Sequence, residues 1–474
     1  MCRASAPTKV SVFVDESPGC HRHRPARRLR SARVKQDTMR ATEELWGIRT
    51  DRRHRDPAWK DTRPSPSLGT AHRSVSRTGL VLVGGGARGA YQAGVLQGLA
   101  EILGERFGDR PPFDVVTGIS AGAINAAYLA SRADRMAEAS GRLAALWGEL
   151  RIDRVMRTDA VSLFSIGSRW LRDLTLGGVL KPNARSNHLL DTTPLREFLS
   201  ANIDFEAIAR HIASDLLHGL AVSATSYTTG TAVTFFDGHG APEPWTRSAR
   251  LGWRARIGLD HVLASASIPI LFRPVFLEGA FYGDGGVGMT SPLSPAIHLG
   301  ADRVVAISVR HRRDRDSNAQ VTHEHHDQGD ISIADIAGVM LNTAFMDALD
   351  SDAERMARIN QTLTLIGERR RAEHPHWLRS IPLLVIRPSV DLGALAADQF
   401  SRLPATLRYL TRGIGASPER GADFVSYLAF DPSYTRPLIE IGRRDAVAQK
   451  DEIEAFFSSR PATCTPAAGG RHAS

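Results

Sequence analysis

The sequence predicts an α/β fold built around a parallel β-sheet, and three observations lead to this prediction. Two short apolar runs, Thr78–Val83 and Phe113–Ile119, are each followed by a glycine-bearing turn and a segment with apolar residues at helical spacing. Continuous apolar runs of this length suit strands that are buried on both faces of a parallel sheet. Of the 474 residues, 42% are apolar, which is enough to bury a large core. Strand–turn–helix units repeated around such a core are typical of α/β proteins.

The elements follow one another along the chain from residue 78 onward. The first strand leads through Gly84–Gly89 into a helix over Ala90–Leu103, and the second leads through Ser120 into a helix over Ala121–Ser131. The remaining predicted elements are mostly helix and loop over 140–215, strands at 220–224 and 232–236, a hairpin of 274–277 and 280–282, strands at 303–309 and 382–387, and helices at 331–360 and 437–457.

Composition divides the chain into five segments. The segments are a basic stretch over 1–77 that we predict to be disordered, a folded domain over 78–310, a polar His-rich loop or linker over 311–330, a mostly helical extension over 331–460 that packs on this domain, and a disordered tail over 461–474. The first segment is rich in Arg, Pro, Ser and His, and it has too few aliphatic residues to offset the entropy of ordering.

The net charge of +9 is concentrated in the first segment. Residues 1–77 hold 18 of the 60 Lys and Arg and 8 of the 51 Asp and Glu, a net of +10, so the rest of the chain carries a net of −1. A nucleic-acid groove needs clustered positive charge on the folded domain, so we expect no nucleic-acid partner. One hypothesis is that the basic segment attracts anionic membrane lipids. A solvated tail and an over-extended start, with Met39 as a later initiation point, are the alternatives.

The cysteines and the apolar runs bear on the compartment. Cys2, Cys20 and Cys464 all lie in the terminal segments, where no core would hold them in the geometry of a structural disulfide. The amino terminus has no apolar stretch of signal-peptide length, and no run of 18 apolar residues occurs. We therefore expect a cytoplasmic protein, with peripheral membrane association as the open alternative.

Three candidate catalytic motifs follow one another along the chain: Gly84-Gly-Gly86-Ala-Arg-Gly89, Gly118-Ile-Ser120-Ala-Gly122 and Asp284-Gly-Gly286. Ser120 lies between a strand and a helix, where a sharp elbow turn needs small neighbours such as Gly118 and Gly122 and exposes the hydroxyl as a nucleophile. A serine that merely caps the helix is the structural alternative.

The glycine-rich turn is a candidate oxyanion hole. Three successive glycines after a strand allow backbone N–H groups to converge on one anionic oxygen, so we assign this role to Gly84, Gly85, Gly86, Ala87, Arg88 and Gly89. For Arg88 two roles remain open. Its amide lines the hole, or its guanidinium only anchors the turn to a carboxylate.

The serine also needs a base, and Asp284 is the best candidate. It follows the predicted hairpin, and Gly285 and Gly286 permit a close approach to another loop. Partial desolvation would raise the basicity of its carboxylate. The structural alternative is an aspartate that only caps the turn.

The histidines offer no equally good base. Only His261 and His298 have a helical setting near the motifs. The His-Glu-His-His run at 323–326 lies on an irregular segment without a second ligand cluster, so we predict no metal site.

The three motifs in this order resemble the patatin-like phospholipase family in its bacterial form, and the segment Ala264–Val275 is also similar to that family. The resemblance covers roughly residues 79–310. It implies a three-layer fold with helices on both faces of the sheet, and a Ser120–Asp284 dyad that needs no histidine. It also implies phospholipase A or lysophospholipase-type hydrolysis of lipid acyl esters through an acyl-serine, with neither metal nor organic cofactor.

Three other interpretations of the motifs remain open. A dinucleotide-binding oxidoreductase would use Gly84, Gly86 and Gly89, but its second strand should end in an acidic residue, and here the strand runs into Thr117–Ser120. An α/β-hydrolase with a Ser-Asp-His triad needs a late histidine, for which His298 and His311 are the candidates. A non-catalytic lipid-binding protein of the same fold would have kept the motifs without turnover.

Overall fold

A computed structural model of the protein describes residues 76–107, 111–159, 188–240, 242–312, 331–366, 379–417 and 420–459. The predictions for most of the basic segment, most of the His-rich linker and the carboxyl-terminal tail therefore lie outside the described residues. Within the described ranges, no helix combines the length and the apolar character needed to cross a membrane.

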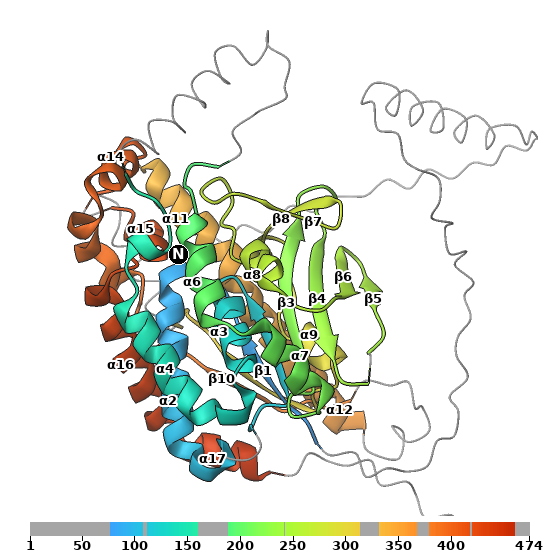
Figure 1. Ribbon diagram of the computed structural model, residues 1–474. Helices are drawn as coiled ribbons and strands as arrows, with labels where there is room; N and C mark the ends of the chain where they lie inside the picture. Colours follow the sequence, from blue (N-terminus) through green and yellow to red (C-terminus); the bar gives the residue numbers. More distant parts are fainter. Residues whose placement is uncertain are drawn as a thin grey trace, which may run out of the picture. The chain divides into compact units, whose positions relative to one another are not determined.

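The predicted α/β fold is confirmed, and its centre is a mixed sheet of ten strands, two more than the sequence predicted (Figure 1). Its strand order is β10-β9-β1-β2-β3-β4-β6-β5, with β8 also paired to β3 and β7 paired to β8. The five strands from β10 to β3 are all parallel. The strands are β1 Thr78–Leu82, β2 Val115–Ile119, β3 Gly219–Ser226, β4 Ala232–Gly238, β5 Trp245–Arg247, β6 Arg250–Arg254, β7 Val275–Leu277, β8 Ala280–Asp284, β9 Arg303–Ile307 and β10 Leu383–Ile386.

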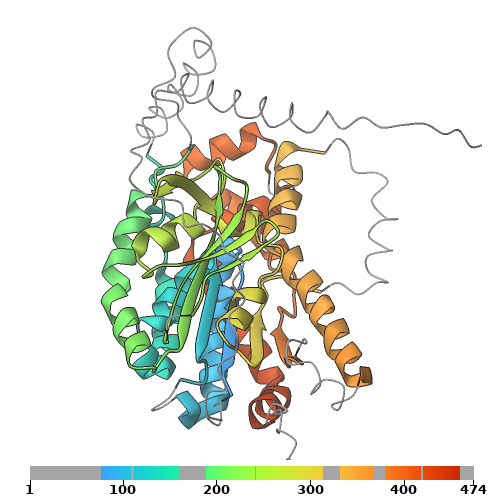
Figure 2. The same cartoon turned by 90° about the vertical axis from the view of Figure 1, so that its right-hand side faces the viewer.

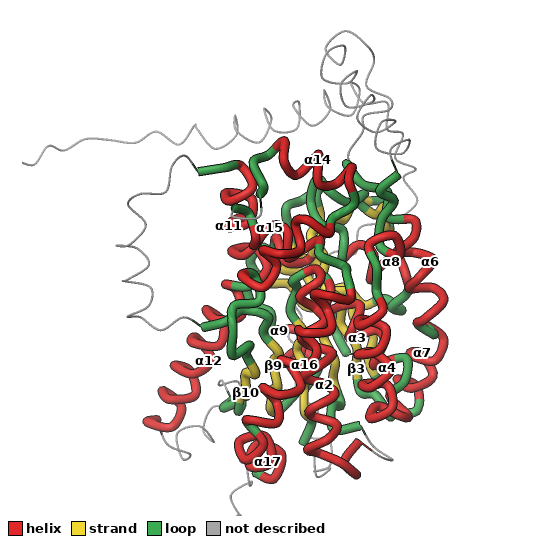
Figure 3. Tube along the Cα trace, turned by 90° about the vertical axis from the view of Figure 1, so that its left-hand side faces the viewer, coloured by secondary structure: helices red, strands yellow, loops and turns green. Residues whose placement is uncertain are grey.

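Helices flank both faces of this sheet, which gives three layers (Figure 2). On one face lie α2 Gly89–Leu103, α3 Ala121–Ala130, α4 Met136–Glu149, α6 Thr193–Asn202 and α7 Phe205–Ala213. On the other face lie α9 Ser294–His298 and α12 Asp347–Ile366. The other α-helices of the described ranges are α8 Leu259–Ser265, α11 Ile333–Phe345, α14 Ala405–Gly413, α15 Ala422–Leu428, α16 Pro432–Ala448 and α17 Lys450–Ser458 (Figure 3).

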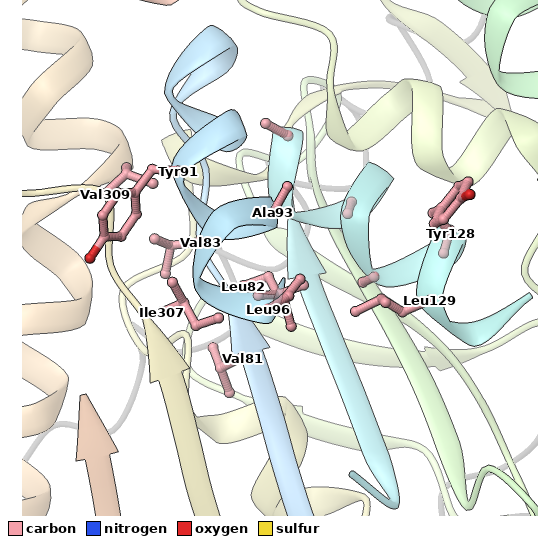
Figure 4. Packing of buried hydrophobic residues seen from close by; sticks show 14 of the residues in the cluster. Val81, Leu82, Val83, Tyr91, Ala93, Leu96, Tyr128, Leu129, Ile307 and Val309 are labelled. Carbon is pink, nitrogen blue, oxygen red and sulfur yellow. The ribbon is translucent and has the colours of Figure 1, made fainter. Parts of the chain in front are cut away.

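One continuous core lies between the sheet and these helices. β1 and β2 are buried along their whole lengths, because apolar side chains cover them from both faces. Figure 4 shows residues of β1, α2, α3 and β9 that contribute to this core. The strands that carry the glycine-rich turn and Ser120 are therefore held in the closely packed core.

The carboxyl-terminal extension shares this core. Strand β10 adds to the parallel sheet beside β9. Helix α16 lies so close to α2 that a Cβ added at Gly94 would stand 1.9 Å from the Ile439 oxygen, and one added at Gly442 would stand 2.2 Å from the Tyr91 oxygen. Glycine is required at both positions because any side chain would push the helices apart.

Two predicted helices differ from the structure. The single helix expected over 331–360 is wrong, because the chain breaks at Met346 between α11 and α12. The break lets Phe345 turn inward against Gly286, where a Cβ would stand 2.0 Å from the ring. The single helix expected over 437–457 is also wrong, because the chain breaks at Gln449 between α16 and α17. Helix α16 begins at Pro432 rather than at Pro437, since the Asp431 side chain caps it by accepting the Ser433 N–H.

Candidate active site

Ser120 lies on a sharp turn between β2 and α3. Its backbone has φ 55° and ψ −126°, a conformation that costs a non-glycine residue about 1–3 kcal/mol. The two glycines around it are required by close packing. A Cβ at Gly118 would stand 2.4 Å from the Gly122 oxygen, and one at Gly122 would stand 2.1 Å from the Leu82 oxygen. The elbow predicted from the sequence is therefore built from these small residues.

A buried serine outside the three motifs supports this strained turn. The Ser120 N–H donates to Ser265 Oγ at 2.9 Å, and the Ser265 hydroxyl donates to the backbone carbonyl oxygen of Ser223 at 2.6 Å. Ser265 is fully buried at the end of α8. It thereby ties the elbow to strand β3, and it satisfies a backbone donor that would otherwise be buried without a partner.

Asp284 reaches the same place from the end of β8. This strand pairs antiparallel with β3, which sets Asp284 opposite Ala224. The Asp284 N–H donates to the backbone carbonyl oxygen of Ser267 at 2.9 Å, and Thr225 Oγ1 donates to the backbone carbonyl oxygen of Asp284 at 2.7 Å. The backbone on both sides of the carboxylate is thus fixed by hydrogen bonds.

The two side chains meet directly. Ser120 Oγ donates to Asp284 Oδ2 at 2.6 Å, and the Gly286 N–H donates to Asp284 Oδ1 at 2.9 Å. Ser120 is 3% exposed and Asp284 is 0% exposed. Burial raises the pKa of Asp284 from 3.8 to about 7, although the hydrogen bonds from Ser120 and Gly286 act in the opposite direction. The carboxylate is therefore far more basic than an aspartate in water.

The glycine-rich turn borders Ser120. A Cβ on Gly84 would stand 3.0 Å from the Ser120 Cβ, and Gly86, with φ 56°, lines the same cavity as Ser120. Within the described ranges, the N–H of Arg88 is used by the turn itself, donating to the Gly85 oxygen at 3.1 Å, and that of Gly89 donates to the Gly86 oxygen. The N–H groups of Gly85, Gly86 and Ala87 have no acceptor among those residues.

The Arg88 side chain points away from Ser120, toward the carboxyl-terminal extension. Its buried guanidinium donates to Ser426 Oγ at 2.8 Å and pairs with Asp423 at 2.8 Å, and it lies 4.8 Å from the centre of the Tyr427 ring. Of the two roles left open for Arg88, these contacts correspond to the anchor. They hold the glycine-rich turn against α15.

An apolar cavity opens beside Ser120. It encloses about 680 Å³, its open mouth included, between helices α3, α4 and α6. Apart from Ser120 and Asn202, its walls are apolar or aromatic; they include Ile124, Tyr128, Leu143, Leu146, Trp147, Leu195, Phe198, Leu199, Phe272 and Phe430. Such walls suit a hydrocarbon chain rather than a polar ligand.

The candidate histidines have other partners. His298 Nδ1 contacts the Ser294 oxygen at 2.8 Å, and its ring stacks on Trp245 at 4.5 Å. His311 Nδ1 contacts the Pro388 oxygen at 2.9 Å, and His261 Nδ1 accepts the Gly258 N–H at 3.1 Å.

The side-chain partners of Asp284 in the described ranges are Ser120 and Gly286, and no histidine bonds to either end of the pair. In the part of the chain that the structure describes, no three His, Cys, Asp or Glu side chains gather in a way that could hold a metal ion. The cluster at 323–326 lies outside that part.

Sequence reasoning missed the supporting residues. Ser265 and Ser267 both lie in Ala264–Val275, the segment similar to the patatin-like family, but nothing in its pattern assigned them a role. The only available signal was the presence of two serines in the segment that precedes the Asp284 motif. Their contacts with Ser120 and Asp284 depend on the position of α8, which the sequence does not specify.

One protein-family model matches the part of the chain that carries this site. The model of the patatin-like phospholipase family matches residues 80–297, a range that contains all three motifs. No curated protein matches the chain.

Three solved structures resemble it at low identity. VipD from Legionella pneumophila shares 14% identity over 77% of this chain and 67% of that chain, with a TM-score of 0.26. The type III effector protein ExoU shares 16% identity over 80% of this chain and 54% of the ExoU chain, with a TM-score of 0.28. A chain of the ExoU–SpcU heterodimer from the type III secretion system of Pseudomonas aeruginosa shares 15% identity over 79% of this chain and 76% of that chain, with a TM-score of 0.22. The chain thus spans about half the length of one ExoU chain.

The family match and the order of the three motifs agree with the α/β fold around them. Residues 80–297 of the chain are therefore a patatin-like phospholipase domain, a domain of lipid ester hydrolases.

Proposed function

We propose that this protein cleaves acyl esters of phospholipids or lysophospholipids, with Ser120 as the nucleophile and Asp284 as its general base. The observation that carries the proposal is the 2.6 Å hydrogen bond from the Ser120 hydroxyl to the Asp284 carboxylate, beside an apolar cavity. On this proposal, residues 78–310 are the catalytic domain and the helical extension buttresses it.

The first half of the reaction forms an acyl-serine. Ser120 Oγ attacks the ester carbonyl carbon while its proton passes to Asp284 Oδ2. The carbonyl oxygen becomes an oxyanion, which accepts hydrogen bonds from the N–H groups of Gly85 and Gly86, since these have no other acceptor among the described residues. The tetrahedral intermediate then breaks its bond to the leaving alcohol, and Asp284 returns the proton to that alcohol.

The second half releases the fatty acid. A water molecule attacks the acyl carbon, and Asp284 takes one proton from it. The second tetrahedral intermediate collapses, the ester bond to Ser120 breaks, and Asp284 gives the proton back to Ser120 Oγ. A buried carboxylate whose pKa is about 7 suits both steps, because it can accept and release a proton near neutral pH.

The apolar cavity favours a substrate that is recognised through a long acyl chain. Each methylene group buried there would contribute about 0.8 kcal/mol. The almost wholly apolar walls offer little to a polar acyl group.

Analysis of released fatty acids tests the proposal. The protein is incubated with a mixed lipid extract, and the products are identified by mass spectrometry, with Ser120→Ala and Asp284→Asn as the inactive variants. We expect fatty acids and lysolipids from the wild type and none above background from either variant. His298→Gln and His311→Gln test the triad, and the expected result is near-normal turnover. Loss of activity in either histidine variant, or retention in Asp284→Asn, would overturn the dyad.

Labelling with a fluorophosphonate distinguishes the proposed enzyme from a non-catalytic lipid-binding protein. Such a protein would release no fatty acid, and its Ser120 would not react with a fluorophosphonate although the fold is intact.

A further inference from the structure

Exposed apolar side chains gather at one end of the molecule. α11, α14 and the β7–β8 hairpin all lie at this end in Figures 1 and 2. Their large exposed apolar residues, together with neighbours in the adjoining loops, are Tyr227, Ile270, Phe276, Phe281, Val287, Ile331, Ile333, Ile336, Val339, Met340, Tyr409 and Leu410. We call this set the apolar rim. Patches of this kind mark sites that bind another protein or a membrane.

Helix α11 contributes the largest share of the rim. Its inner side is buried through Ala334, Gly338 and Phe345. Its outer side carries Ile333, Ile336 and Met340, which are 64%, 51% and 67% exposed. These three positions share one helical face, because they are three and four residues apart. The helix is thus apolar on the side that faces water as well as on the side that faces the core.

Helix α14 extends the rim and adds positive charge. The two helices are joined where the Ala334 N–H donates to the Ile414 oxygen at 2.8 Å. Tyr409, 78% exposed, lies between Arg408 and Arg412 along the chain. The Arg408 guanidinium donates to a backbone oxygen and that of Arg412 lies over an aromatic ring; neither forms an ion pair with an acidic residue of the described ranges. Arginines beside exposed aromatic and aliphatic side chains suit an anionic lipid surface.

The rim is continuous with the active site. Phe345, at the end of α11, packs against Gly84 and Gly286, which border Ser120 and Asp284. On the hairpin, Phe276 and Phe281 have ring centres 5.0 Å apart. They border a groove that shares the wall residues Leu195, Ala266 and Phe272 with the apolar cavity. The groove therefore lies between the cavity and the rim, and its other walls carry charged residues, among them Asp191, Arg196, Asp260 and Arg273.

We propose that the apolar rim docks the protein on the surface of an anionic lipid bilayer. A phospholipid drawn from the bilayer would then place its polar headgroup among the charged residues of the groove and its acyl chain in the apolar cavity, a step that rests on the proposed function. The position of the groove between the rim and the cavity favours a membrane over a protein partner, since a protein covering the rim would close the groove.

Vesicle flotation with the Ser120→Ala protein tests this docking, because the lipid stays intact. The vesicles are phosphatidylcholine with about a quarter phosphatidylglycerol, compared with phosphatidylcholine alone. We expect binding to the anionic vesicles, and we expect each of Ile333→Ser, Ile336→Ser and Met340→Ser to weaken it about tenfold. Arg408→Gln with Arg412→Gln should remove the preference for anionic lipid.

Two control variants lie outside the rim. Leu365→Ser removes an apolar side chain that is 87% exposed on α12, and Arg254→Gln removes an exposed arginine on β6. Both should bind vesicles like the parent protein. Equal binding by the rim variants and the controls would overturn the proposal, and so would self-association that the α11 variants abolish while vesicle binding stays unchanged.

Docking and catalysis can fail separately. Hydrolysis of a soluble short-chain ester by the α11 variants in the otherwise wild-type protein should be unchanged. Vesicle binding without any hydrolysis would refute only the proposed function. Hydrolysis of the soluble ester without vesicle binding would refute only the docking.

Discussion

Replacing Asp284 with asparagine should inactivate the protein and make it more stable at high pH. The Asp284 carboxyl group is fully buried, and burial raises its pKa from 3.8 to about 7. A group whose pKa is raised in the folded state stabilises the fold fully below its unfolded pKa, and this contribution is lost as pH rises through the folded pKa. Asparagine has the same shape and never ionises, so the variant escapes this loss.

The size of the effect follows from the two pKa values. Between pH 5 and pH 8 the wild type should lose about 3 kcal/mol of unfolding free energy through Asp284, at about 1.4 kcal/mol for each pH unit between 5 and 7. The free energy of unfolding of Asp284→Asn relative to the wild type should therefore increase by this amount over the same range. Urea unfolding followed by tryptophan fluorescence at several pH values measures the difference.

An exposed aspartate gives the matched control. Asp398 is exposed in the 3₁₀ helix Ala394–Arg402, and Asp398→Asn should change stability by less than about 0.5 kcal/mol at either pH. If the difference between Asp284→Asn and the wild type were the same at pH 5 and pH 8, the carboxyl group would not be the buried base that the mechanism needs.

Three further predictions concern the same site. The kcat/KM for a soluble ester should rise about tenfold per pH unit below pH 7 and level off above it, because Asp284 must be ionised to accept the proton; a flat profile from pH 5 to pH 8 would contradict this. Gly86→Ala should lower kcat about a hundredfold and destabilise the fold, since the residue has φ 56° and its new Cβ would stand 2.4 Å from a backbone oxygen. Ser265→Ala should cost about 1–3 kcal/mol of stability and lower kcat with little change in KM, because the Ser120 N–H loses its acceptor.

Matched variants separate strain and stability from catalysis in two of these experiments. Gly279 has φ 87° but no neighbour within 4 Å of an added Cβ, so Gly279→Ala should keep full activity. Ser140 is fully buried in α4 and donates to the Met136 oxygen, so Ser140→Ala should lose stability without losing kcat. Similar losses of kcat in a variant and its control would mean that the site is sensitive to any destabilisation.

The parallel part of the fold could be predicted because its signals are local. The apolar run at Thr78–Leu82 and the glycines after it specify a buried strand and a tight turn without reference to the rest of the chain. The same holds for Ser120, whose elbow needs Gly118 and Gly122 beside it. The prediction that Asp284 approaches Ser120 came from the hairpin and the two glycines around Asp284 together with the family resemblance, and the two side-chain oxygens lie 2.6 Å apart.

The remaining features depend on contacts between distant segments. The break at Met346 follows from the space that Gly84 and Gly286 leave for the Phe345 ring, which no periodicity of α11 reveals. The edge strand β5 and its neighbour β6 were not predicted, because exposed positions interrupt their apolar pattern. The role of Ser265 likewise depends on how α8 packs beside β3.

The rate of fluorophosphonate labelling tests the central claim most directly, because it measures the nucleophilicity of Ser120 without any lipid. The wild type should acquire one adduct, located on Ser120 by peptide mass spectrometry, and Ser120→Ala should acquire none. Labelling of Asp284→Asn should be about a hundredfold slower or more, since no base accepts the serine proton. Labelling of Asp284→Asn at the wild-type rate, or an adduct on another residue, would contradict the account.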